Sequence, residues 1–255
     1  MINVSEGRDR SVVRRIAVAG GVCLLDVHSD AHHNRSVISL AGQGVERAAR
    51  DVTTEALRWI DLRLHVGVHP RLGAVDVVPF VPLEGSSMDH ALAARDRFAV
   101  WAGGELGIPC FLYGPHRSLP DVRRAAFTRL APDTGPAVAH PTAGAICVGA
   151  RPVLVAYNVW LAPGVPVAVA RDVARQIRGP GLRALGLDVG GRAQVSMNLV
   201  DPLGVTPADA YDAVAALAPV ERAELVGLVP AAVLDAVPQE RWAELDLDPE
   251  RTLTG

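Results

Sequence analysis

Lysine is absent from this chain of 255 residues, and all 25 of its basic residues are arginines. With 28 acidic residues the formal net charge is −3, and the two signs are mixed, which argues against a nucleic-acid-binding surface. The sequence contains no run that approaches the roughly 20 apolar residues of a membrane span. Its first ten residues lack the apolar region of a secretory signal peptide. We therefore expect a cytoplasmic protein with no nucleic-acid or membrane partner.

Cysteine is scarce as well. Cys23, Cys110 and Cys147 lie far apart, each in an apolar run. An odd number at such spacing indicates neither a disulfide framework nor a metal-ligand set, so we expect reduced thiols in the core. Hydrophobic residues make up 49% of the chain, which is enough for a packed core in one large domain or two small ones.

The apolar pattern of the first half predicts a β-α-β-β-α-β order. The expected elements are a strand at 2–4, a helix at 10–19, strands at 22–27 and 35–40, a helix at 45–60 and a strand at 74–80. A helix from Ser86 or Ser87 to 106, a strand at 108–113 and a short helix at 119–130 follow. Residues 131–144 are irregular and rich in Pro, Gly, Ala and Thr, and they form either a linker or a binding loop.

The second half repeats this order of elements. It predicts a strand at 153–161, a helix at 166–177, a hairpin of 183–189 and 193–200, a helix at 207–217, a strand at 220–229 and one short helix in the tail from 237. The split β-α-β arrangement occurring twice predicts an α+β protein of two ferredoxin-like lobes, 1–144 and 145–255. A cleft between the lobes is the expected ligand site.

Residues 64–82 hold the densest group of reactive side chains. His65, His69, Arg71 and Asp76 lie within a few residues of one another. Two histidines four apart would share one face of a helix in a zinc protease, but Gly67 and the proline after His69 exclude a helix. The pair is therefore expected on an extended loop that leads into the strand at 74–80, either as surface residues or as catalytic ones.

Three other groups have both a structural and a functional interpretation. The segment 28–35, H-S-D-A-H-H-N-R, is either a metal-ligand set, for which Asp26, Asp76 and Asp89 would have to converge, or a polar hairpin turn. The turn at 3–8 is either a helix cap or an anion site at a helix start. Arg151 is either a surface charge or an anchor that binds a carboxylate with its planar fork.

Several blocks, in order from residue 3 to about 229, resemble the glutamate formimidoyltransferase family, whose domain is also fused to a cyclodeaminase in the bifunctional animal enzyme. The blocks are N-V-S-E-G-R at 3–8, L-L-D-V at 24–27, H-N-R-S-V at 33–37, H-V-G-V-H-P-R-L-G-A-V-D-V-V-P-F-V-P-L at 65–83, E-L-G-I-P-C-F-L-Y at 105–113, A-P-D-T-G-P at 131–136, H-P-T-A-G-A-I-C-V-G-A-R at 140–151, L-V-A-Y-N-V-W-L at 154–161 and Q-V-S-M-N-L-V-D at 194–201. The His-Pro-Arg block is the most specific of them.

The resemblance implies two ferredoxin-like lobes and transfer of a formimidoyl group from N-formimidoyl-L-glutamate to N5 of tetrahydrofolate. Tetrahydrofolate is then a co-substrate, no metal is needed, and the protein is a homodimer. The implied catalytic residue is His69, directly before Pro-Arg, and the implied folate-binding stretch is 135–144. Because the glutamate product has two carboxylates, arginines are expected at the site. The expected substrate-binding residues are Arg35, Arg71, Arg151, Asp76, Gly135, Pro136, His140, Pro141, Thr142, Ala143 and Gly144.

The chemistry of such a transfer suits a histidine, because a group that titrates near neutral pH can take the proton from N5 and give one to the departing nitrogen. Two positions depart from the family pattern: Val68 stands where the family has Glu, and His28 where it has Asp. They leave two alternatives open, a related one-carbon transferase that uses another amidine or formyl donor, and a folate-binding protein without turnover.

Overall fold

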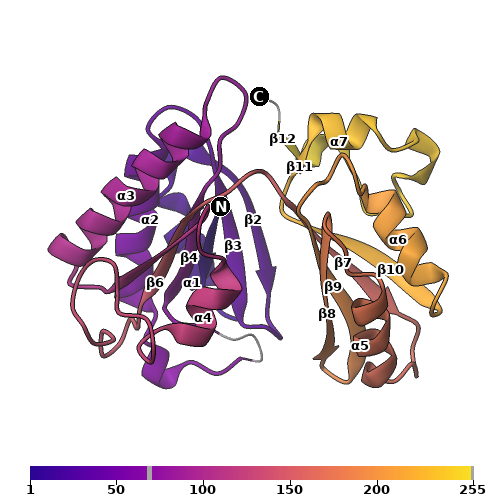
Figure 1. Ribbon diagram of the computed structural model, residues 1–255, viewed down its shortest axis with the longest axis horizontal. Helices are drawn as coiled ribbons and strands as arrows, with labels where there is room; N and C mark the ends of the chain where they lie inside the picture. Colours follow the sequence, from indigo (N-terminus) through magenta and orange to yellow (C-terminus); the bar gives the residue numbers. More distant parts are fainter. Residues whose placement is uncertain (68–70, 254–255) are drawn as a thin grey trace. The chain divides into compact units, whose positions relative to one another are not determined.

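The computed structural model describes residues 1–67 and 71–253 and divides into two compact units, Met1–Pro152 and Val153–Gly255 (Figure 1). Both units combine helices with a β-sheet, so the predicted α+β class is confirmed. Among the described residues, no helix has the length and apolar character needed to cross a membrane.

The first unit begins with the predicted β-α-β-β-α-β order. Its elements are β1 (Ile2–Val4), α1 (Arg10–Val18), β2 (Leu24–Asp30), β3 (Arg35–Leu40), α2 (Val45–Trp59) and β4 (Val75–Phe80), with 3-10 turns at Gly21–Cys23 and Leu62–Leu64. These strands lie in the order β2-β3-β1-β4, and each is antiparallel to its neighbours. This is the ferredoxin-like arrangement.

The same sheet continues beyond β4 with two parallel strands. α3 (Met88–Glu105), β5 (Cys110–Tyr113), α4 (Leu119–Ala125) and β6 (Ile146–Ala150) complete the unit. β6 lies between β4 and β5 and is parallel to both. Side chains cap the helices as the sequence leads one to expect: Ser87 accepts the His90 N–H at the start of α3, and Ser118 accepts the Asp121 N–H at the start of α4.

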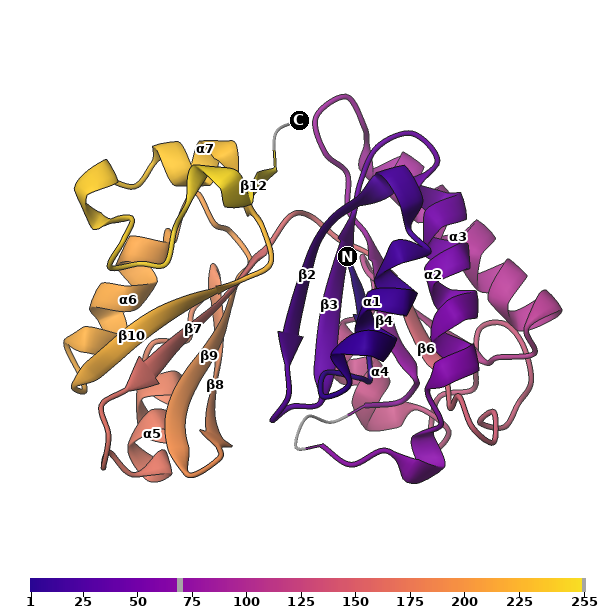
Figure 2. The same ribbon diagram turned by 180° about the vertical axis from the view of Figure 1, so that it is seen from behind.

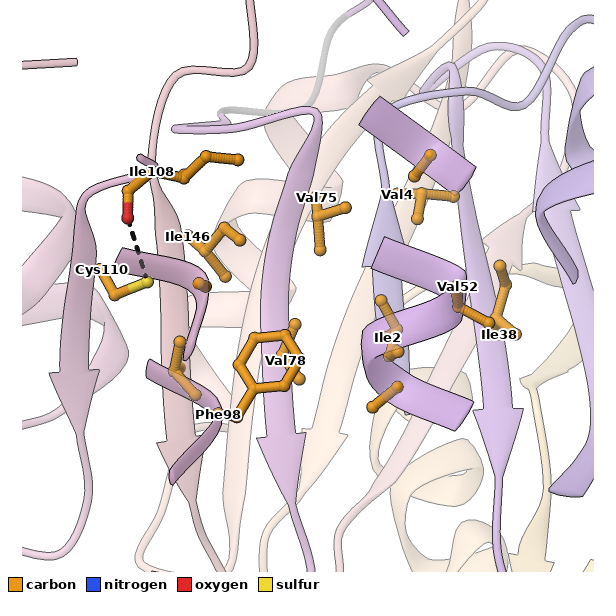
Figure 3. Packing of buried hydrophobic residues seen from close by; sticks show 14 of the residues in the cluster. Ile2, Val4, Ile38, Val52, Val75, Val78, Phe98, Ile108, Cys110 and Ile146 are labelled. Atoms are coloured by element: carbon orange, nitrogen blue, oxygen red, sulfur yellow. Dashed lines mark hydrogen bonds between the residues drawn. The ribbon is translucent and has the colours of Figure 1, made fainter. Parts of the chain in front are cut away.

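Two apolar clusters cover the two faces of this sheet. One lies between the sheet and α1, α2 and α3 (Figures 2 and 3) and includes Val4, Val52, Val78 and Phe98. The other joins the opposite face to α4; its buried members are Val77, Phe111, Tyr113, Val122, Ala145 and Cys147. All three cysteines are free and buried, which confirms the prediction of core thiols.

The predicted boundary between the lobes differs from the division seen in the structure. It was expected after Gly144, whereas the first unit extends to Pro152 because β6 completes its sheet. The interpretation of 131–144 as a linker is wrong: the Cys110 N–H donates to the Thr134 carbonyl (2.9 Å), and Thr134 Oγ1 donates to the Ala99 carbonyl of α3 (2.7 Å). This stretch belongs to the first unit.

The second unit is a separate four-stranded ferredoxin-like sheet. Its elements are β7 (Val155–Leu161), α5 (Val167–Gln176), β8 (Leu182–Val189), β9 (Arg192–Leu199), α6 (Pro207–Ala215) and β10 (Val220–Val226). The strands are antiparallel in the order β10-β7-β9-β8, and α5 and α6 cover one face.

The tail of the second unit packs onto the same core. It contains β11 (Val229–Pro230), α7 (Ala231–Asp235), 3-10 turns at Gln239–Arg241 and Pro249–Arg251, and β12 (Thr252–Leu253), which is parallel to β11. Leu245 is buried, and its carbonyl accepts the hydroxyl of Tyr157 (2.9 Å). The tail from 237, in which one short helix was expected, contains the two 3-10 turns, and the α-helix α7 precedes it.

Candidate active site

The loop that leads into β4 is fastened to the turn between β2 and β3. His65 Nε2 donates to the Asn34 carbonyl (3.1 Å), and Asn34 Nδ2 donates to the Val66 carbonyl (2.9 Å). The Arg71 guanidinium donates to His65 Nδ1. Burial, and then the charge of Arg71, lower the pKa of His65 below its ordinary value. His65 is therefore a neutral structural link between the two segments.

Asp76 is the extra residue of a β-bulge. Adjacent residues Asn3 and Val4 of β1 pair with Val77 and Val75 of β4, so Asp76 has no partner in the register. A bulge redirects the side chains of its strand, which explains why Val75 and Val78 face one apolar cluster and Val77 the other. The bulge turns a carboxylate toward the face that α4 covers.

The Asp76 carboxylate is 1% exposed and is held on both oxygens. Oδ1 accepts the Leu72 N–H (2.7 Å), and Oδ2 accepts Arg123 Nη2 of α4 (2.5 Å). Since Leu72 follows Arg71, Asp76 fixes the backbone at the point where the chain leaves the loop. A buried carboxylate with these partners is a rigid anchor for the site.

Several arginines surround this carboxylate. Burial lowers the pKa of the Arg35 guanidinium to about 10, while Asp76 opposes the shift and the charges of Arg123 and Arg71 add to it. The pKa of Arg71 is also lowered by burial, with Asp76 opposing and Arg8 contributing. The charged side chains of the cluster are Arg8, Arg35, Arg71, Arg123, Asp76 and Glu6. Among the residues that the structure describes here, the four cations outnumber the two anions, which favours binding of a further anion.

The turn at residues 140–144 is joined to the same segment. The Ala74 N–H donates to the Ala143 carbonyl (2.9 Å) and the Leu62 N–H to the Thr142 carbonyl (2.8 Å). His140 Nδ1 accepts the Ala143 N–H (3.1 Å) inside the turn. Gly144 has a φ of +71°, and a Cβ there would lie 2.1 Å from the Leu72 carbonyl oxygen. Only glycine fits at this position, where the backbone of the turn passes close to that of Leu72.

The structure thus brings together Arg35, Arg71 and Asp76 with the turn that carries His140, Pro141, Thr142, Ala143 and Gly144. His69 lies outside the described residues, but Gly67 and Arg71, on either side of its segment, belong to this group. A Cβ on Gly67 would lie 2.7 Å from an Arg71 guanidinium nitrogen and 2.5 Å from the His33 carbonyl oxygen. The chain therefore enters and leaves residues 68–70 beside the arginine cluster.

Two predicted site residues lie elsewhere. Arg151 follows β6 at the end of the sheet opposite to Asp76, where its guanidinium donates to the Pro152 carbonyl (2.9 Å) and bonds with Tyr113. Burial lowers the pKa of Arg151, and Tyr113 opposes that shift. Gly135 packs against Gly103 of α3, on the other face of the sheet, and Pro136 beside it is exposed. The structure does not group these residues with the arginine cluster.

The metal interpretation finds no support in geometry. Within 1–67 and 71–253, no three His, Cys, Asp or Glu side chains come together in a way that could hold a metal ion. Asp26 and His28 lie on β2, whereas Asp89 lies in the first turn of α3.

Comparison with known proteins identifies the family. Residues 1–151 match the model of the formiminotransferase domain, N-terminal subdomain. The chain belongs to the formiminotransferase family. A glutamate formimidoyltransferase of Streptococcus pyogenes serotype M1 is 38% identical over 227 residues, covering 78% of this chain and 76% of the relative. A glutamate formimidoyltransferase of Thermoplasma acidophilum is 36% identical, covering 89% of this chain and 86% of the relative.

A longer relative is similar over part of its length. The formimidoyltransferase-cyclodeaminase of Sus scrofa is 36% identical over 273 residues, which is 92% of this chain. This chain spans 50% of that relative. Membership of the formiminotransferase family therefore rests on similarity across nearly the whole chain.

Arg123 is the residue of the cluster that the sequence analysis did not single out. It lies in a short helix among other arginines, and nothing next to it distinguishes it from Arg124, whose side chain is 69% exposed. A signal was available from its partner, because Asp76 interrupts an apolar strand and a buried carboxylate needs a cation. That reasoning predicts an arginine but not which one.

Proposed function

We propose that this protein transfers the formimidoyl group of N-formimidoyl-L-glutamate to N5 of tetrahydrofolate. The names of two relatives similar over most of this chain, both glutamate formimidoyltransferases, support that activity. The main observation in its favour is the excess of arginine side chains around Asp76, which lies beside the turn at 140–144. The described residues on either side of the segment that contains His69 adjoin this cluster. A donor with two carboxylates is the kind of ligand that such a cluster attracts.

In this proposal His69 is the general acid and base. N5 of the folate attacks the formimidoyl carbon, and His69 accepts the N5 proton. The bond from that carbon to the glutamate nitrogen then breaks with the electron pair staying on nitrogen, and His69 gives the proton to that nitrogen. Proton transfer of this kind contributes about 10²–10⁴-fold to the rate. Orientation of the two substrates contributes up to roughly 7–11 kcal/mol of the barrier.

The other residues have binding roles. Arg35 and Arg71 hold the carboxylates of the donor, and Asp76 holds Arg71 in position through Leu72. The turn at 140–144 binds the folate. Tetrahydrofolate is the co-substrate, the protein works in the cytoplasm on small molecules, and it forms a homodimer, the last by resemblance to the family alone.

The experiment that tests this function is a panel of donors. Purified protein is mixed with tetrahydrofolate and, in turn, N-formimidoyl-L-glutamate, N-formyl-L-glutamate and N-formimidoylglycine, and the 5-substituted folate is measured. We expect formimidoylglutamate to give the highest kcat/KM. A preference for another donor supports the related one-carbon transferase, the alternative suggested by His28 and Val68, which depart from the family pattern. Folate binding without product from any donor supports the binding protein.

A further inference from the structure

Arg8 is the cation of the cluster that has no role in the mechanism above. It lies between β1 and α1, and its side chain is exposed. Its Nε donates to the Ala31 carbonyl (2.9 Å), which places the guanidinium against the turn between β2 and β3. Within residues 1–67 and 71–253, no carboxylate pairs with this guanidinium. Its two Nη groups, which form a fork that suits a carboxylate, are therefore available to a ligand.

The backbone that carries Arg8 is fixed as well. The Glu6 carboxylate accepts the Arg8 N–H (2.7 Å), and the Gly7 N–H donates to Asn34 Oδ1 (2.9 Å). A Cβ on Gly7 would lie 2.3 Å from the Asp30 carbonyl oxygen, so the chain runs tightly along the turn. Arg8 is thus held at its backbone and at Nε. A side chain positioned in this way loses little conformational freedom when it binds a ligand.

Arg71 lies against the same turn. A Cβ on Gly67 would be 2.5 Å from the His33 carbonyl oxygen and 2.7 Å from an Arg71 guanidinium nitrogen, so this guanidinium is close to the turn. The positive charge of Arg8 contributes to the lowered pKa of Arg71. Like charges on neighbouring side chains repel each other, and an anion bound by both removes that repulsion.

The arginines of the cluster differ in depth. The Arg35 guanidinium is buried, Arg71 is half-buried and Arg8 is exposed. In formimidoylglutamate the α-carboxylate is bonded to the carbon that carries the leaving nitrogen, whereas two methylene groups separate the side-chain carboxylate from that carbon. The reacting end of the donor therefore belongs with the deeper arginines, and the far carboxylate with the exposed one.

We propose that Arg8 binds the side-chain carboxylate of the donor and selects formimidoylglutamate against donors that lack this charge. The inference rests on the proposed function. No bond is made or broken at Arg8: its Nη groups donate two hydrogen bonds to the carboxylate, while Nε stays on the Ala31 carbonyl. Because the side chain is exposed and its charge is screened by solvent, we expect this contact to change affinity by about 10-fold.

The test compares the parent with Arg8→Gln and the matched control Arg14→Gln, an exposed arginine of α1. Glutamine has its Nε2 at the position of the arginine Nε, so Arg8→Gln retains a donor for the Ala31 carbonyl and removes only the fork. Each protein is assayed with tetrahydrofolate and three donors for kcat, KM and kcat/KM. The donors are N-formimidoyl-L-glutamate, N-formimidoyl-L-glutamine, in which an amide replaces the side-chain carboxylate, and N-formimidoyl-4-aminobutyrate, which lacks the α-carboxylate.

The parent should prefer formimidoylglutamate to formimidoylglutamine by about 10-fold in kcat/KM, and Arg8→Gln should lose this preference. The loss should come from a higher KM for formimidoylglutamate, with kcat and melting temperature close to those of the parent. The preference for formimidoylglutamate over formimidoyl-4-aminobutyrate should stay the same, because both donors keep the side-chain carboxylate. Arg14→Gln should match the parent with all three donors.

The other outcomes separate this assignment from the proposed function. An active parent whose Arg8→Gln variant keeps the preference over formimidoylglutamine overturns the assignment alone. A variant that instead loses the preference over formimidoyl-4-aminobutyrate shows that Arg8 binds the α-carboxylate, and one that loses activity with all three donors and melting temperature together shows a structural role; both overturn it too. A folded parent that yields no product with any donor overturns the proposed function, and this inference with it.

Discussion

At the scale of single residues, the site depends on a carboxylate in an apolar strand. The bulge of β4 buries Asp76, and its two carboxylate oxygens accept hydrogen bonds from the Leu72 N–H and from Arg123. The stabilising effect of the ion pair itself is small, because desolvation opposes the attraction. Removing one partner is costly, since the other charge stays buried.

Asp76→Ala is therefore expected to lower the free energy of unfolding by roughly 3–5 kcal/mol, because it leaves Arg123 and the Leu72 N–H without their partner. Urea denaturation measures this. The matched control is Asp96→Ala, whose carboxylate pairs with Arg95 but is 53% exposed, and which should change stability by about 0–1 kcal/mol. Equal effects of the two substitutions would contradict the role given to Asp76.

His65 makes stability depend on pH. Burial and Arg71 lower its pKa in the folded state below the ordinary 6.5. The unfolded chain therefore takes up a proton first, so this contribution to stability is complete above pH 6.5 and is lost as the pH falls through the folded pKa. Melting temperatures measured from pH 8 to pH 5 should fall less steeply for His65→Gln than for the parent. His90→Gln should follow the parent curve, and identical slopes for all three would refute the assignment.

At the scale of elements, the order of helices and strands follows from apolar periodicity. Alternation of apolar and polar residues predicted β3, and helical spacing of apolar residues predicted α1 and α2. One element that was missed is β6, whose five residues are all buried and show no alternation because the strand is covered on both faces. The bulge of β4 also escaped prediction: Asp76 interrupts the apolar strand, but the sequence does not show that the pairing with β1 skips a residue there.

The geometry of the site depends directly on the turn at 140–144. Gly144→Ala should be strongly destabilising, because φ is +71° and the new Cβ would meet the Leu72 carbonyl oxygen. Gly164→Ala is the control, since Gly164 has a similar φ of +85° but open space around it. Each substitution lowers the melting temperature by some amount, and the difference between the two decreases measures the effect of the steric clash with Leu72. A difference near zero would show that the turn is not held against Leu72.

At the scale of the whole molecule, the chain consists of two units, each with its own sheet and core. The sequence predicted both units but ended the first one too early. The residues before β6 are irregular, so their sequence resembles a linker. The hydrogen bonds that keep them in the first unit join positions far apart in the chain. Such pairings cannot be read from local pattern.

Fragments test the observed division. Residues 1–152 and 153–255 should each fold with a cooperative transition, because each retains a complete sheet. Residues 1–144 should fail to fold, because loss of β6 leaves β4 and β5 without the strand between them. Circular dichroism and thermal melting measure both. A folded 1–144 fragment with the stability of 1–152 would contradict the role of β6.

Only part of the site was predictable, because the sequence shows residues that are close along the chain but not those that the fold brings together. Arg71 and Asp76 stand out because they lie close together in one block, and His140 because its block resembles a family. Arg123 and the contact of Arg8 with the turn between β2 and β3 required the fold, since they depend on which strand ends and helices come together. Arg151 shows the converse: it lies in a motif of the family, yet β6 carries it away from Asp76.

The most direct test of the account is the initial rate of 5-formimidoyltetrahydrofolate formation from formimidoylglutamate and tetrahydrofolate, compared between the parent and His69→Ala. The account predicts product from the parent and a rate at least about 10²-fold lower for His69→Ala, with similar melting temperatures because the sequence predicts a loop at this position. No product from folded parent protein, or a His69→Ala rate within a few-fold of the parent, would contradict it.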